Sequence, residues 1–378
     1  SGPTDRAAER KAVARSENGA EGMKESQTHS APFPASSLVP ALCRLGAPGN
    51  KLAEQGNEMM SVSRNSPNTL SRRNLLGAVV AIVAIAGIGL SGAVFAGEKT
   101  ASATTAYPLW IMEKDGHTVY LVGQTPPRNS AWRDARIEGL LNGSGEIWTE
   151  TNQVRRNKPP TEYLMNPAKP LSDYLSTTDL SRVKRAGEIA QVQMEQIAPL
   201  RPWTAAATLE SAYFQAEKLD LEGTVESVLL RAATLEKIPH SSEFEAQDDV
   251  VQFMGEMSAQ EDVQFLQYTL DRILAGVAEN ERIYAAWARG DAGPATEFVA
   301  SMKSAQPQLY AKHVVERNRR WLPRFDAMQK KAKPSLVIVG LFHMVGPDSL
   351  VEQLKKDGWS VRRTTEPPKN LPTDKPQS

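Results

Sequence analysis

The chain has 378 residues and carries 44 basic and 44 acidic side chains, so its formal net charge is zero. A balanced charge gives no electrostatic reason to expect a nucleic acid or an acidic membrane surface as a partner, and we predict neither. The single cysteine, Cys43, cannot form an internal disulfide.

Residues 1–58 are rich in Ala, Ser, Glu, Gly and Pro, and Phe33 is their only aromatic residue. A segment of this composition buries too little apolar surface to offset its chain entropy, so we predict disorder. The chain does not begin with methionine, whereas Met59 and Met60 would open a plausible N-terminus. We therefore expect residues 1–58 to be an upstream extension or a misassigned start.

Residues 59–96 have the pattern of an export signal. The motif Ser-Arg-Arg-Asn-Leu-Leu at 71–76 leads into an uncharged run over 75–95, and Val94-Phe95-Ala96 offers small residues for a signal peptidase. This pattern resembles a bacterial twin-arginine signal and predicts a mature protein from about Gly97 that is periplasmic or secreted. The run is also long enough to cross a bilayer, so the alternative is an inner-membrane anchor facing the periplasm, with no other membrane contact.

The mature chain opens with a predicted hairpin. Two apolar runs at 108–113 and 117–123 are joined by Lys114-Asp115-Gly116, and Asp-Gly between such runs is a strong turn signal. The second strand ends at Gly123-Gln124, and Pro126 and Pro127 stop it. We then expect a helix over 131–141 with Ser130 as its N-cap, and a strand over 146–150 with Glu150 at its exit.

Helical patterns dominate the region from about 179 to 331. The predicted segments are 179–195, 203–217, 223–236, 245–256, 258–289, 292–304 and 307–331. In the last of them one helical stripe is formed by Val314, Asn318, Trp321, Phe325 and Met328. Because a buried amide is costly unless it is paired, Asn318 should bond a specific loop or ligand.

A continuous apolar run over 335–339 predicts a fully buried strand, followed by Gly340 and then His343. Ligands bind at the carboxyl ends of strands in open α/β sheets, so His343 is a functional candidate. The alternative is a histidine satisfied by backbone hydrogen bonds. A helix over 348–357 opened by Pro347, a strand over 359–362 and a disordered tail over 364–378 complete the chain.

These elements predict an α/β domain over 97–363 with a mixed central sheet and a large helical insertion. Several short motifs in this order resemble the TraB/GumN family, whose animal relatives include the TIKI metalloproteases. The matching stretches are Leu109-Trp110, Thr118-Val-Tyr-Leu-Val-Gly123, Ile147-Trp148-Thr149-Glu150, Pro202-Trp203, Tyr284-Ala-Ala-Trp287, Gly290-Asp291, Glu316-Arg317-Asn318 and Gly340-Leu-Phe-His343-Met-Val-Gly346.

The resemblance implies a site at the strand ends where histidines of two Gly-x-x-His motifs and a glutamate hold a divalent metal (Mn, Co or Zn) that hydrolyses peptide bonds. In this chain His343 and Glu150 match, but Pro126 occupies the position of the first histidine. Proline cannot ligate a metal. The Gln124 side chain offers only a weak neutral oxygen.

The other histidines are less suitable as substitutes. His117 precedes Gly123 by six residues, which places it about 20 Å away on the same strand. His240 and His313 would approach the site only if the tertiary fold brings them there.

Two readings remain for each charged candidate. Glu150 is either a metal ligand or general base, or an ion-paired carboxylate at a strand end. Arg317 either pairs with Glu150 or another carboxylate, which we favour, or binds an anion. We expect Gly123, Asn318 and Gly340 to line the site.

The favoured function is an exported envelope protein whose metal hydrolase site is degraded and retained for binding or regulation, with an unidentified peptide or envelope partner. The first rival is a metal-dependent peptide hydrolase with a rearranged set of ligands, formed by Glu150, His343 and either Gln124 or His313. The second is a purely structural envelope protein.

Overall fold

A single six-stranded sheet organises the part of the chain that the structure, a computed structural model, describes: residues 107–152, 159–166 and 168–366. The predicted extension at 1–58, the signal at 59–96 and most of the tail lie outside these residues. The strands are β1 (Leu109–Lys114), β2 (His117–Gln124), β3 (Glu146–Thr151), β4 (His240–Phe244), β5 (Ser335–Gly340) and β6 (Ser360–Thr364).

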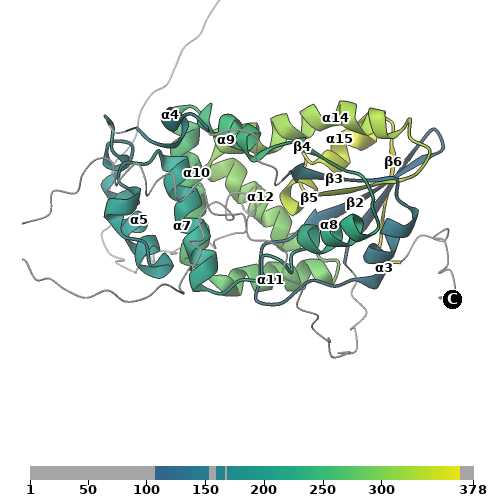
Figure 1. Cartoon of the computed structure of the whole chain (residues 1–378), viewed down its shortest axis with the longest axis horizontal. Helices are drawn as coiled ribbons and strands as arrows, with labels where there is room; N and C mark the ends of the chain where they lie inside the picture. The colour runs from purple at the N-terminus through teal and green to yellow at the C-terminus, as the bar shows by residue number, and fades with distance from the viewer. Residues whose placement is uncertain (1–106, 153–158, 167, 367–378) are drawn as a thin grey trace, which may run out of the picture. The chain divides into compact units, whose positions relative to one another are not determined.

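The helices are α3 (Ala135–Glu138), α4 (Thr161–Leu164), α5 (Thr177–Ala190), α6 (Met194–Ile197), α7 (Pro202–Ala216), α8 (Val225–Leu235), α9 (Gln247–Gly255), α10 (Ala259–Ala275), α11 (Val277–Ala288), α12 (Gly293–Ala305), α13 (Pro307–Tyr310), α14 (Arg317–Met328) and α15 (Leu350–Lys356). In Figure 1, α14 and α15 lie on one side of the sheet and α8 and α3 on the other, while α4, α5, α7 and α10 form a separate helical group. The predicted class, an α/β fold with a mixed sheet and a large helical insertion, is confirmed. No helix among the described residues is long and apolar enough to span a bilayer.

The order of the strands places the carboxyl ends of four adjacent parallel strands at one edge of the sheet. The order is β4-β3-β5-β2-β1-β6, in which β4, β3, β5 and β2 are parallel to one another and β1 is antiparallel to both β2 and β6. Parallel strands end on the same side, so the residues that close β2, β3, β4 and β5 meet there. This is the edge at which α/β sheets place their ligands.

The hairpin between β1 and β2 forms as the sequence predicts. Asp115 and Gly116 both have positive φ, 50° and 80°, which matches the turn that suits the right-handed twist of two antiparallel strands. Leu109 pairs with Val122 and Lys114 with His117. The turn therefore fixes the register that brings Gly123 to the end of β2.

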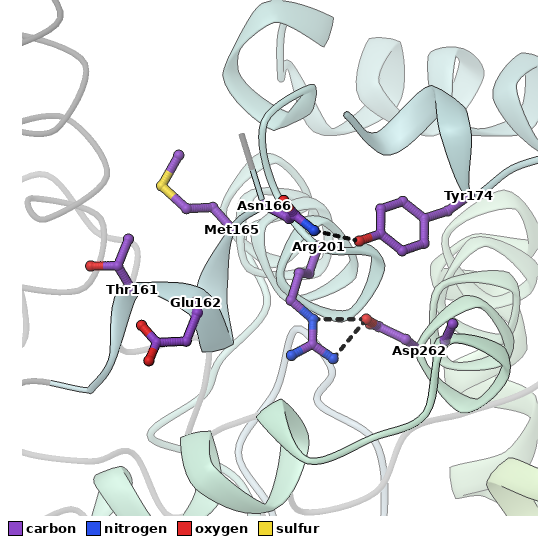
Figure 2. A pocket seen from close by; sticks show the side chains of 8 residues that line it. Thr161, Glu162, Met165, Asn166, Tyr174, Arg201 and Asp262 are labelled. Atoms are coloured by element: carbon purple, nitrogen blue, oxygen red, sulfur yellow. Dashed lines mark hydrogen bonds and ion pairs between the residues drawn. The ribbon is translucent and has the colours of Figure 1, made fainter. Parts of the chain in front are cut away.

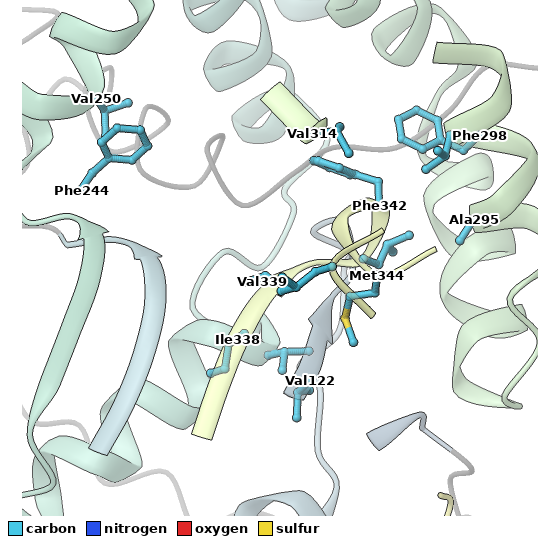
Figure 3. Close-up of a cluster of buried hydrophobic side chains, with 14 of the residues drawn as sticks. Val122, Phe244, Val250, Ala295, Phe298, Val314, Ile338, Val339, Phe342 and Met344 are labelled. Carbon is cyan, nitrogen blue, oxygen red and sulfur yellow. The ribbon is translucent and has the colours of Figure 1, made fainter. Parts of the chain in front are cut away.

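Strand β5 is the centre of the core. All six of its residues are buried, and it lies between β2 and β3, with Val337 opposite both Leu121 and Trp148. Figure 3 shows Ile338 and Val339 of this strand beside Phe342 and Met344, which follow it. The Phe342 ring also packs on Phe298 of α12 at a centroid distance of 5.9 Å, so α12 covers the end of the strand.

The five tryptophans singled out by the motifs belong to this interior, with exposed fractions between 0% and 6%; they are Trp110, Trp148, Trp203, Trp287 and Trp321. The apolar stripe predicted along α14 is also buried throughout.

Two of the predicted helices are interrupted in the structure. Residues 131–141 do not form one helix: α3 begins after Asp134, whose side chain accepts a hydrogen bond from the Arg136 backbone, and a 3-10 turn follows. Ser130 is therefore not the N-cap. The segment predicted as one helix over 258–289 divides at Gly276, whose φ of 83° is incompatible with a helix.

Strand β4 was not predicted, because its sequence His-Ser-Ser-Glu-Phe lacks the apolar run of a buried strand. It lies at the edge of the sheet, where one side of the strand has no neighbour, and Ser242 and Phe244 are its two buried residues. Polar residues are tolerated at such a position. The strand places Glu243 near Glu150, at the carboxyl ends of the parallel strands.

Candidate functional site

Glu150, the fifth residue of β3, is held by two neighbouring elements. Its Oε1 accepts a hydrogen bond of 2.6 Å from the backbone N–H of Gly340 at the end of β5. Its Oε2 accepts one of 2.7 Å from Arg317 Nη2. The side chain has no solvent exposure. Both carboxylate oxygens of the predicted metal ligand therefore already accept strong hydrogen bonds.

Arg317, the first residue of α14, lies between two carboxylates. Besides Glu150, it donates from Nε and Nη2 to Glu243 Oε2 at 2.9 and 2.5 Å. Arg320, one turn further along, donates to the other oxygen of Glu243. Burial opposes the charge of the completely buried Arg317, but Glu243 and Glu150 outweigh it and raise its pKa. Of the two readings of Arg317, ion pairing within the protein is the one that the geometry supports.

Glu243 is a member of the site that the sequence did not reveal. Glu243 was not predicted as a site residue because β4 was not predicted as a strand. A glutamate one residue before a buried Phe244, in a segment between two helices, was the only indication.

His343 is fixed by Asn318. The Asn318 Nδ2 group donates to the backbone oxygen of Asp348 at 2.9 Å, so its Oδ1 faces His343 Nδ1 at 2.7 Å. His343 Nδ1 must then carry the proton, and Nε2 carries the lone pair. The expectation that Asn318 bonds a specific loop is confirmed.

The second nitrogen of His343 points towards Glu150. Nε2 lies 3.8 Å from Glu150 Oε2 and has no hydrogen-bond partner among the described residues. The ring is completely buried and packs against Trp321 and Phe342 at centroid distances of 4.5 and 4.7 Å. Burial is the main reason why its pKa falls from 6.5 to about 3, so the ring is neutral at physiological pH.

Two glycines let the backbone approach this network. A Cβ on Gly123 would lie 2.8 Å from Trp287 Cζ2, and the Gly123 carbonyl accepts a hydrogen bond of 2.6 Å from the Tyr107 hydroxyl. A Cβ on Gly340 would lie 3.3 Å from Glu150 Oε1. Close packing is thus the physical reason for glycine at the end of both β2 and β5.

A comparison with protein-family models identifies this architecture. The model of the TraB/PrgY/gumN family matches residues 108–363. The chain belongs to this family. No curated protein and no solved structure matches the chain.

In this member of the TraB/PrgY/gumN family, Gln124 is directed to another element. Its side-chain oxygen accepts a hydrogen bond of 2.9 Å from the backbone N–H of Glu226 in the first turn of α8. The oxygen that we predicted as a metal ligand therefore anchors a helix. The geometry gives no support to Gln124 as a ligand.

The remaining histidines of the described chain contact other groups. His117 contacts the Lys331 carbonyl at the opposite end of β2, and His240 contacts the Thr149 hydroxyl at the beginning of β4. His313 is buried between the rings of Phe253 and Phe265, with Nε2 3.4 Å from Met257 Sδ. None of them supplies the imidazole that Pro126 replaces.

His313 lies in a π-helical segment, Ala311–Glu316, that directly precedes Arg317. Such a segment widens the helix by one residue per turn and shifts every later side chain around the axis. It therefore helps to set the direction in which Arg317 and Asn318 project. Burial is the main cause that keeps the pKa of His313 well below 6.5.

The donor set does not fit the divalent metal that the family resemblance implies. Within the residues that the structure describes, no three His, Cys, Asp or Glu side chains are grouped so that they could hold a metal ion. Of the predicted ligands, Glu150 and His343 approach each other, and the Arg317 cation is already bonded to the Glu150 oxygen that faces His343. A second cation at this place would be repelled by Arg317 and would have too few ligands.

Proposed function

We propose that this chain is an exported TraB/PrgY/gumN-family protein of the bacterial envelope that acts by binding or regulation, without a catalytic metal. The observation that carries the proposal is the bond between Arg317 and Glu150. A positively charged guanidinium holds the carboxylate that a metal would need. Pro126 removes the second imidazole at the same time.

In such a protein the buried network has a mechanical role. Glu150 joins β3 to β5 through Gly340, Arg317 joins both to α14 and β4, and His343 joins the turn after β5 to α14 through Asn318. These contacts hold the ends of the parallel strands in one arrangement. A peptide or another envelope protein would then be recognised by the surface that this frame supports.

Metal analysis of the purified full chain tests the proposal. The chain would be prepared with Mn, Co and Zn supplied in the growth medium, together with His343→Ala and a matched variant, His117→Ala, at the far end of β2. We expect far less than one metal ion per chain in all three proteins. Stoichiometric metal in the unaltered chain and in His117→Ala, lost in His343→Ala, would overturn the proposal.

The rival function, a metal-dependent peptide hydrolase with rearranged ligands, has one observation in its favour. The lone pair on His343 Nε2 points towards Glu150, and Asn318 fixes the tautomer in the way that ligating histidines are commonly fixed. The metal result above separates the two functions. A metal-loaded chain that cleaves peptides only while His343 is present would establish the hydrolase.

The cellular location is part of the proposal and has its own test. The twin-arginine-like motif supports export to the periplasm, and the apolar run over 75–95 supports the alternative of an anchored protein. Replacing Arg72 and Arg73 by lysine should retain the chain in the cytoplasm, as judged by cell fractionation. Carbonate extraction of the exported unaltered chain then distinguishes a cleaved from an anchored form.

A further inference from the structure

A cavity of about 430 Å³ lies in the helical part of the protein, and its lining shares no residue with the network around Glu150. It is bounded by α4, the segment after α4, and the beginnings of α7 and α10; the lining residues are Thr161, Glu162, Met165, Asn166, Tyr174, Arg201, Ala259 and Asp262 (Figure 2). Cavities of this size accommodate small ligands or a few side chains. No role follows for it from the proposed function.

Two charged groups in its wall, Arg201 and Asp262, neutralise each other. Arg201 Nε donates to Asp262 Oδ2 at 3.0 Å, and its other nitrogens donate to the backbone oxygens of Gly255 and Met257. Asp262 Oδ1 accepts a hydrogen bond of 2.6 Å from the backbone N–H of Trp203. Asp262 is only 1% exposed. This pair is therefore a rigid part of the wall, with no charge left for a ligand.

The carboxylate of Glu162 is the charge that remains in the lining. It is exposed, and no described residue forms an ion pair or hydrogen bond with it. The net charge of the lining residues is consequently −1. A ligand that is attracted electrostatically to this lining must place a positive charge close to Glu162.

The other lining groups suit an aliphatic stem that carries such a charge. Met165 and the ring of Tyr174 provide apolar contacts, and aromatic faces attract ammonium groups. Lys169, which does not line the cavity, already occupies one face of the Tyr174 ring with its Nζ at 4.0 Å, so the ligand stem contacts the rest of the ring. Asn166 donates to the Tyr174 hydroxyl, so the hydroxyl proton can be donated to a ligand.

We propose that this cavity binds an alkylammonium group, as carried by a lysine side chain of a peptide or by a small free amine. Glu162 pairs with the ammonium, the stem lies along Met165 and Tyr174, and the amide of Asn166 hydrogen-bonds the polar part of the ligand. The Arg201–Asp262 pair holds the wall in place. This site is independent of whether the network around Glu150 binds a metal.

Isothermal titration of the full chain tests the proposal with three probes. N-acetyl-L-lysine amide represents the peptide source and cadaverine the free amine, while N-acetyl-L-norleucine amide has the same stem length without the charge. We expect binding of at least one cation and no measurable binding of the norleucine compound. A higher affinity for the lysine compound assigns a peptide, and a higher affinity for cadaverine assigns a free amine.

Two variants connect the binding to this cavity. Glu162→Gln should weaken the binding of the cation by about two- to fivefold, the range typical of an exposed ion pair. The matched variant Glu236→Gln removes an exposed carboxylate at the end of α8 and should leave the affinity unchanged. Because Glu162 is exposed and unbonded, its variant should unfold at the same urea concentration as the unaltered chain. Absence of binding by both cations, equal binding by the norleucine compound, or an unchanged affinity in Glu162→Gln would each overturn the proposal.

Discussion

Arg317 Nη2 donates a hydrogen bond of 2.7 Å to Glu150 Oε2, and neither side chain is exposed to solvent. The two residues are 167 positions apart in the sequence. Their bond joins the edge of the sheet to the beginning of α14. A buried ion pair of this kind contributes little to stability by its presence, but it makes the loss of either partner expensive.

Replacing Arg317 by methionine should therefore destabilise the protein strongly. Glu150 would remain buried without a counter-ion, and such losses cost about 3–5 kcal/mol. Arg320→Met is the matched control, because Arg320 also bonds Glu243 but its side chain is 51% exposed, so we expect less than about 1 kcal/mol. Urea denaturation measures both values. Equal costs for the two variants would contradict the role given to Arg317.

Replacing Gly123 by alanine should test the packing at the end of β2. The new Cβ would lie 2.8 Å from Trp287 Cζ2 and 3.0 Å from Met344 Sδ, closer than carbon atoms pack. Overpacking of a core costs about 1–3 kcal/mol. Gly139→Ala serves as the control, since no atom lies within 4 Å of its added Cβ and its φ is −63°. If Gly123→Ala and Gly139→Ala unfold at the same urea concentration, the end of β2 can accommodate a Cβ without overpacking.

Replacing Asn318 by leucine should allow both neutral tautomers of the His343 ring to be populated. Leucine has a similar volume but leaves His343 Nδ1 without its partner, and a buried unsatisfied group costs about 1–3 kcal/mol. The Asp348 carbonyl keeps the hydrogen bond of 2.8 Å that Gln353 Nε2 donates to it. Nitrogen chemical shifts of the His343 ring report which nitrogen carries the proton. We expect the proton on Nδ1 in the unaltered chain and a mixture of tautomers in the variant.

Asn280→Leu is the matched control for this experiment. Asn280 is also buried and also donates to a backbone oxygen, that of Pro127, but it has no bond to a histidine. Its loss should reduce stability without a change in the His343 shifts. If both variants leave the ring shifts unaltered, Asn318 does not fix the tautomer.

The parts of this site that the sequence predicted are those with a local signal. The Asp115-Gly116 turn sets the hairpin, and the run before Gly340 predicts a buried strand, so the positions of Gly123 and His343 followed. The stripe containing Asn318 placed that amide in the interior, where it needed a partner. In each case the pattern of neighbouring residues determined the outcome.

The parts that were missed depend on distant contacts. Glu243 reaches the site on an edge strand whose sequence is too polar to be recognised. The Gln124 side chain turns to the Glu226 backbone because α8 begins beside it, and nothing near Gln124 in the sequence records that. The π-helical turn before Arg317 likewise has no simple sequence signal. Tertiary packing determines all three.

The His343 ring should make stability depend on pH in the acidic range. Burial lowers its pKa in the folded protein to about 3, against 6.5 for the ordinary group, so between these values the unfolded chain binds more protons than the folded one. Stability contributed by this difference is fully present above pH 6.5 and is lost as the pH falls towards 3. Between pH 7.5 and pH 5 the loss from this one ring is about 2 kcal/mol.

His343→Gln isolates this contribution, because the carboxylates and other titrating groups are common to both proteins. The free energy of unfolding in urea, measured at pH 7.5 and pH 5, should fall less in the variant than in the unaltered chain, by about 2 kcal/mol. The difference between the two pH values is compared, so a constant cost of the substitution does not enter. An identical fall in both proteins would contradict this prediction, because it would mean that His343 is protonated in the folded state at pH 5.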